Sequence, residues 1–125
     1  MRRATTTVQM FVRAAFVVQL VLGVLVWIGT ARGLVPLHQT IGILLVLGLW
    51  TMAFLAARAG VRPPLVALAA VWGLIVLVLG LSQTRLLVGS AHWVIQVLHL
   101  LVGLGLIGQA EGLAARIKQR LAPVA

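Results

Sequence analysis

The sequence predicts an all-α integral membrane protein, an antiparallel four-helix bundle that forms one domain over residues 1–125. Hydrophobic residues make up 62% of the chain. Charged residues make up only 9%, whereas a soluble domain carries about 25%. The apolar residues fall into four runs, at residues 8–29, 36–57, 64–81 and 91–114. Each run is close to the roughly 20 residues that a helix needs to cross a bilayer, so the lipid bilayer is the first predicted partner.

Local signals mark the ends of these runs. Pro36 and Pro64 suit the first turn of a helix, where an N–H has no helical partner in any case. Ser90 is expected to cap the last helix. The connections between the runs are short, and short connections make consecutive helices antiparallel neighbours.

The basic residues predict the orientation of the chain. Eight of the ten lie on one side of the four runs, whereas Arg32 and Arg85 lie on the other. Because cytoplasmic segments are enriched in Lys and Arg, we expect both termini in the cytoplasm and the chain in the plasma (inner) membrane of a prokaryote. Arg13 falls just inside the first run and is expected to reach back to the cytoplasmic interface. The basic residues cluster at the ends of apolar runs, which excludes nucleic acid as a partner.

All three histidines lie in the half of the bundle that is expected to face away from the cytoplasm. His38 follows the start of the second run by about two residues, and His92 follows the start of the fourth by about one. His99 lies seven residues further on, about 10 Å deeper along the helix. Seven residues are nearly two helical turns, so His92, Gln96, His99 and Gly103 form one stripe. Ionisable residues in a membrane span are rare and suggest a functional site.

A weak internal repeat relates the two halves of the chain. The segment RGLVPLH at 32–38 resembles RLLVGSAH at 85–92, and FLAAR resembles GLAAR further on. We therefore expect a pseudo-twofold axis that relates the first two helices to the last two. The first match pairs His38 with His92, the second places it midway between the later histidines, and HQTIG against HLLVG pairs it with His99. The partner of His38 on the fourth helix stays open.

Axial ligation of haem is the favoured role for the histidines, ahead of wetted interfacial residues, an interhelical hydrogen bond, a proton relay or a zinc site. Imidazole is a standard axial ligand of haem iron, and helical bundles build cofactor sites from facing helices. Gly42 and Gly103 would leave room for a flat macrocycle. Arg32 and Arg85 are the basic residues on the histidine side and would pair with the haem propionates. The chain has no cysteine, which excludes iron–sulfur clusters and thiolate zinc sites.

The segments HQTIGILLVLGLW and HWVIQVLHLLVGLGLIG are similar to the histidine-bearing helices of one half of a haem A synthase. The resemblance implies a four-helix cytochrome b in which His38 is the ligand on the second helix. It implies His99 as the ligand on the fourth helix, with His92 as the alternative. The catalytic half of that family has a glutamate and an arginine where this chain has Val35 and Gln39. The resemblance therefore implies a haem-binding scaffold without haem hydroxylation.

These observations predict a membrane protein that binds one haem b through two histidines near the outer face. Because both axial positions would be filled, we expect one-electron transfer or haem holding more than catalysis. A quinone, or a partner protein at the face of Arg32 and Arg85, is the expected redox partner, and a homo-oligomer is left open. The alternative is a haem-free accessory or assembly subunit of a larger membrane complex. Its signature would be an exposed stripe of small residues formed by Gly105, Gly108 and Gly112.

Overall fold

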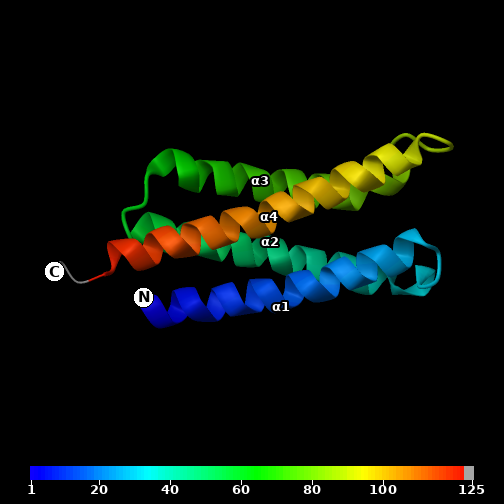
Figure 1. Cartoon of the computed structure of the whole chain (residues 1–125). Helices are drawn as coiled ribbons and strands as arrows, with labels where there is room; N and C mark the ends of the chain where they lie inside the picture. The colour runs from blue at the N-terminus through cyan, green and yellow to red at the C-terminus, as the bar shows by residue number, and fades with distance from the viewer. Residues whose placement is uncertain (123–125) are drawn as a thin grey trace.

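The chain folds into four α-helices and two short 3₁₀ turns, as seen in a computed structural model that describes residues 1–122 (Figure 1). Over these residues the secondary structure is entirely helical, which confirms the predicted all-α four-helix bundle. All four α-helices are long and apolar enough to cross a membrane. The elements are α1 (Arg2–Trp27), η1 (Arg32–Leu34), α2 (Val35–Arg58), α3 (Pro63–Ser82), η2 (Gln83–Arg85) and α4 (His92–Arg120).

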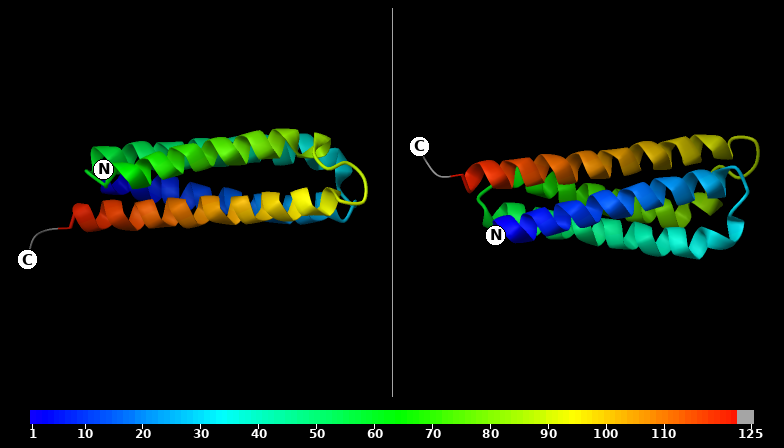
Figure 2. Two further views of the ribbon diagram at one scale, coloured as in Figure 1. Left: turned by 90° about the horizontal axis from the view of Figure 1, so that it is seen from above. Right: turned by 60° about the horizontal axis from the view of Figure 1, so that its bottom comes forward.

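Consecutive helices run antiparallel, so the bundle has two different ends (Figures 1 and 2). The α1–α2 and α3–α4 connections lie together at one end, which we call the two-loop end. The start of α1 and the end of α4 lie at the other, which we call the terminal end. Helices α2 and α4 pack against each other and against both remaining helices, whereas α1 and α3 make no contact within residues 1–122. The core therefore centres on α2 and α4, whose Leu49, Met52, Leu106 and Ile117 are fully buried.

The helices extend beyond the apolar runs at the terminal end. Helix α1 begins at Arg2, six residues before the predicted span 8–29. Helix α4 ends at Arg120, six residues after the end of the predicted span 91–114. A helix needs only its own backbone hydrogen bonds to continue, so apolar composition marks the membrane crossing and not the helix end. The predicted cap of α4 was wrong: the N-cap is Ala91, without a side-chain hydrogen bond, and Ser90 lies in the preceding turn.

Two tryptophans set how neighbouring helices pack. The indole of Trp50 on α2 covers Gly73 of α3, and the indole of Trp72 on α3 covers Gly105 of α4, so closely that neither glycine has room for a Cβ. Each indole N–H also donates to a backbone carbonyl of the helix that it faces, at 3.0 Å from Trp50 and 2.9 Å from Trp72. Because each ring occupies the space left by the missing side chain of one glycine, these contacts fix the register of α3 on α2 and of α4 on α3.

The same packing interrupts the predicted stripe of small residues on α4. Gly105 lies under the ring of Trp72, and the space beside Gly112 is taken by the guanidinium of Arg116 from the same helix. Gly108 is exposed and has open space beside it. The three glycines therefore do not form one continuous exposed face.

A polar network ties α1 to α4 toward the terminal end. The guanidinium of Arg13 donates to both carboxylate oxygens of Glu111, at 2.6 and 2.7 Å. The amide of Gln9 also donates to Glu111 at 2.6 Å, and the ammonium of Lys118 donates to the Gln9 oxygen at 2.6 Å. Arg13 thus pairs with Glu111, the only acidic residue of the chain.

Candidate functional site

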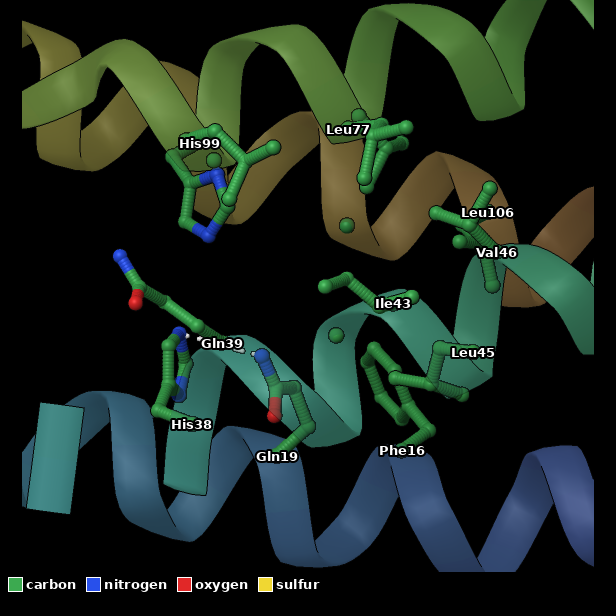
Figure 3. A pocket seen from close by; sticks show the side chains of 15 residues that line it. Phe16, Gln19, His38, Gln39, Ile43, Leu45, Val46, Leu77, His99 and Leu106 are labelled. Atoms are coloured by element: carbon green, nitrogen blue, oxygen red, sulfur yellow. Dashed lines mark hydrogen bonds between the residues drawn. The ribbon is translucent and has the colours of Figure 1, made fainter. Parts of the chain in front are cut away.

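Two histidines from the central helix pair face each other across a cavity near the two-loop end (Figure 3). His38 lies in the first turns of α2, and His99 lies two turns into α4. Their ring centroids are 6.1 Å apart and their planes meet at 60°. Both side chains are only partly exposed. Because α2 and α4 are in direct contact, the two imidazoles are brought together by the short diagonal of the bundle.

Each imidazole lies against a glycine of the preceding helix. A Cβ at Gly23 of α1 would lie 3.1 Å from Cε1 of His38, and a Cβ at Gly80 of α3 would lie 3.2 Å from Cε1 of His99. Both distances are shorter than ordinary van der Waals contact, so glycine allows each ring its place. The matched contacts support the predicted relation between the two halves, with His99 as the counterpart of His38.

The two rings differ in their hydrogen bonding. The side-chain amide of Gln19 on α1 lies 3.1 Å from Nε2 of His38. With the amide in this orientation its N–H donates, so Nε2 accepts and the ring proton lies on Nδ1. Nδ1 of His38, Nδ1 of His99 and Oε1 of Gln19 are all buried without a hydrogen-bond partner. Buried polar atoms without hydrogen-bond partners are uncommon in proteins. At this site, the polypeptide by itself leaves these three atoms without one.

The space around the pair has two parts. The part toward the middle of the bundle, the central cavity, is walled mainly by aliphatic side chains and three glycines. Its lining residues are Phe16, Gln19, His38, Gln39, Gly42, Ile43, Leu45, Val46, Val76, Leu77, Gly80, Leu81, His99, Gly103 and Leu106.

The part toward the two-loop end, the loop-side cavity, carries more polar groups and has a volume of about 200 Å³. A water molecule fills only about 30 Å³, so this cavity has room for an organic group. Its lining residues are Phe16, Gln19, Leu20, Gly23, Val24, Val26, Trp27, Val35, His38, Gln39, Gln83, Thr84, His92, Gln96, His99, Leu100 and Gly103.

His92 lies apart from the pair. Its Nδ1 is 3.1 Å from the carbonyl oxygen of Leu86, in the connection between α3 and α4. The imidazole therefore ties this connection to the start of α4 while it also lines the loop-side cavity. The predicted stripe of His92, Gln96, His99 and Gly103 does face this cavity as one surface.

The other predicted site residues are placed in different ways. Gly103 lines both cavities and has nothing within 4 Å of where a Cβ would lie, whereas the space beside Gly42 is taken by the Gln19 amide at 3.1 Å. Neither Arg32 nor Arg85 lines either cavity, and the Arg32 guanidinium lies against Gly29. Over residues 1–122 no group of three or more His, Cys, Asp or Glu gathers to hold a metal ion, so the donor set is a pair of imidazoles.

Sequence reasoning missed Gly23 and Gly80, which lie against the two imidazoles, and Gln19, which contacts His38. The tetrapeptide LVLG ends at Gly23 and at Gly80, but it also occurs at 45–48, ending at Gly48, so it does not single out the glycines of the site. No sequence pattern indicates Gln19, because its contact with His38 depends on how α1 is rotated toward α2. No protein-family model, curated protein or solved structure matches this chain.

Proposed function

We propose that His38 and His99 bind the iron of one haem b from opposite sides, and that the protein transfers single electrons or holds haem within the membrane. The observation that carries this proposal is the pair of imidazoles 6.1 Å apart, from two helices that face each other across a cavity. Six-coordinate haem in a helical bundle requires two such ligands on facing helices.

The spacing of the rings fits ligation of one metal ion. A metal–imidazole bond is about 2.0–2.1 Å and the ring centroid lies about 1.1 Å behind the nitrogen, so two imidazoles on one ion have centroids about 6.4 Å apart. The observed 6.1 Å is within a few tenths of an ångström of that value.

The surroundings also fit a flat, largely apolar macrocycle. Gly23 and Gly80 let the rings lie close to α1 and α3, and Gly103 lines both cavities with open space beside it. The leucine and valine side chains of the central cavity offer an apolar surface. Gln39 lines both cavities and has no side-chain hydrogen bond in the part of the chain that the structure describes, so a flat group can displace it without breaking one.

Haem iron would supply one-electron chemistry at this position. The chain places the two imidazole rings with their centroids 6.1 Å apart, beside a central cavity that is walled mainly by aliphatic side chains. If His38 and His99 both bind the iron, no position would stay open for oxygen chemistry. This favours electron transfer or haem holding, with a quinone or a redox protein as the partner.

We also propose that the two-loop end lies outside the cytoplasm, in the plasma membrane of a prokaryote. The support is the distribution of charge: eight of the ten basic residues belong to the terminal end. The histidine pair would then exchange electrons near the outer face of the membrane.

Visible absorption spectra of the purified protein test the proposal. The protein is produced with haem supplied, and spectra are recorded oxidised and after reduction with dithionite. We expect sharp, split α and β bands for the wild type. His38→Gly and His99→Gly should each lose the six-coordinate spectrum and regain it when free imidazole is added, which shows that the variants are folded.

His92→Ala is the comparison that separates the two histidines of α4. Both axial ligands remain in this variant, so the six-coordinate spectrum should persist. A colourless wild-type preparation would refute haem binding. Loss of the six-coordinate spectrum in His92→Ala, together with its retention in His99→Gly, would refute the assignment of His99.

A further inference from the structure

The loop-side cavity differs from the central cavity in carrying several hydrogen-bonding side chains at its wall. Gln83 and Thr84 come from η2, and His92 and Gln96 come from the first turns of α4. Amide and hydroxyl groups donate hydrogen bonds to carboxylates, and an imidazole that takes up a second proton does so as a charged donor. The polar groups gather on one side of the histidine pair, and aliphatic groups dominate the other.

The orientation of His92 suits this role. A carbonyl oxygen can only accept a hydrogen bond, so the contact of Nδ1 with the Leu86 carbonyl at 3.1 Å places a proton on Nδ1. This bond holds the ring at the cavity wall, and Nε2 donates to a carboxylate when the ring carries its second proton. The side chain of Gln96, one turn further along α4, has no hydrogen bond within residues 1–122 and lines the same cavity.

The electrostatics of the two-loop end favour an anion. Helices α2 and α4 both begin here, and neither has a side-chain cap on its first N–H groups. Helix N-termini carry partial positive charge, which stabilises a carboxylate within the first turn. The only acidic residue of the chain, Glu111, lies about 28 Å from His92 along α4 and is paired with Arg13. Within residues 1–122, no negatively charged side chain therefore lies near the loop-side cavity to oppose a carboxylate.

We infer that the loop-side cavity is a carboxylate subsite that binds the propionate edge of the haem, through His92 and Gln96 together with Gln83 and Thr84. This inference rests on the proposed function. It assigns the propionates to the two-loop end and the vinyl and methyl edge to the aliphatic central cavity. It also replaces the expected pairing of the propionates with Arg32 and Arg85, neither of which reaches the cavity wall.

The test compares haem b with its dimethyl ester, in which both carboxylates are blocked. Each is titrated into the purified iron-free protein, and binding is followed by the Soret absorbance. We expect the wild type to bind haem b at least about tenfold more tightly than the ester, because charge-assisted hydrogen bonds are lost on esterification. In His92→Leu and in Gln96→Leu this preference should fall toward unity. The ester should still give a six-coordinate spectrum in both variants.

Two further variants serve as comparisons. Arg32→Gln and Arg85→Gln should keep the wild-type preference for the free acid. Equal binding of acid and ester by the wild type would overturn the subsite, as would loss of the preference in the arginine variants. Gln96→Leu guards against a folding artefact, since its side chain makes no hydrogen bond to the α3–α4 connection. If the ester binds with a six-coordinate spectrum but without discrimination, the subsite fails and the proposed function stands. If neither compound binds, both fail.

Discussion

In the proposed haem site, Gln19 would compete with the iron for Nε2 of His38, and its replacement tests the proposed site at one atom. The amide lies 3.1 Å from Nε2, so this hydrogen bond must break before the nitrogen can bind iron. A neutral hydrogen bond contributes about 1 kcal/mol net. In Gln19→Met the bond is absent from the iron-free protein, and haem binding should tighten by about fivefold.

The same substitution should leave the stability of the iron-free protein nearly unchanged. The variant loses one hydrogen bond, but it also removes Oε1 of Gln19, which is buried without a partner. An unsatisfied buried polar atom costs about 1–3 kcal/mol, which offsets the lost bond. Methionine has a similar length and shape, so the packing against Gly42 is expected to remain.

The assay is a titration of iron-free protein in detergent with haem b, followed at the Soret band. Gln109→Met is the matched control, because Gln109 also has a buried Oε1 without a partner but lines neither cavity. The control should bind haem as the wild type does. Weaker binding by Gln19→Met would refute the reasoning, since Gln19 would then support the ligand and not compete for it. Equal binding would show that Nε2 of His38 is not the atom that binds iron.

Two further changes probe the site and the scaffold separately. Gly80→Ala adds a Cβ 3.2 Å from Cε1 of His99, so the imidazole must turn from its preferred position. A distortion of about 1 kcal/mol should lower haem affinity about fivefold. The control is Gly108→Ala, which lies on an open surface and should leave haem affinity unchanged. Glu111→Gln removes the charge that Arg13 pairs with, and because Arg13 is exposed and Glu111 is partly exposed, the loss of stability should be small. Thermal unfolding in detergent measures that loss, and a changed Soret spectrum in Glu111→Gln would contradict the separation of the network from the site.

The four helices and the depth of the histidines follow from the sequence alone. Apolar runs long enough to cross a bilayer can satisfy their backbone only as helices, and short connections force these helices to alternate in direction. The rise per residue then places His38 and His99 in the same half of the bundle. These conclusions need only the order of apolar, polar and histidine residues along the chain, which is why the structure confirms the architecture.

The tertiary structure decided which residues meet. His92 and His99 share one stripe of α4, and sequence matching supported either as the partner of His38. The choice depends on how far α4 slides and rotates against α2, and that is set by side chains of other helices, such as Trp72, whose indole covers Gly105. Register of this kind depends on long-range packing and not on local periodicity. This packing brings the ring centroids of His99 and His38 to 6.1 Å from each other. It leaves His92 hydrogen-bonded to the Leu86 carbonyl in the α3–α4 connection.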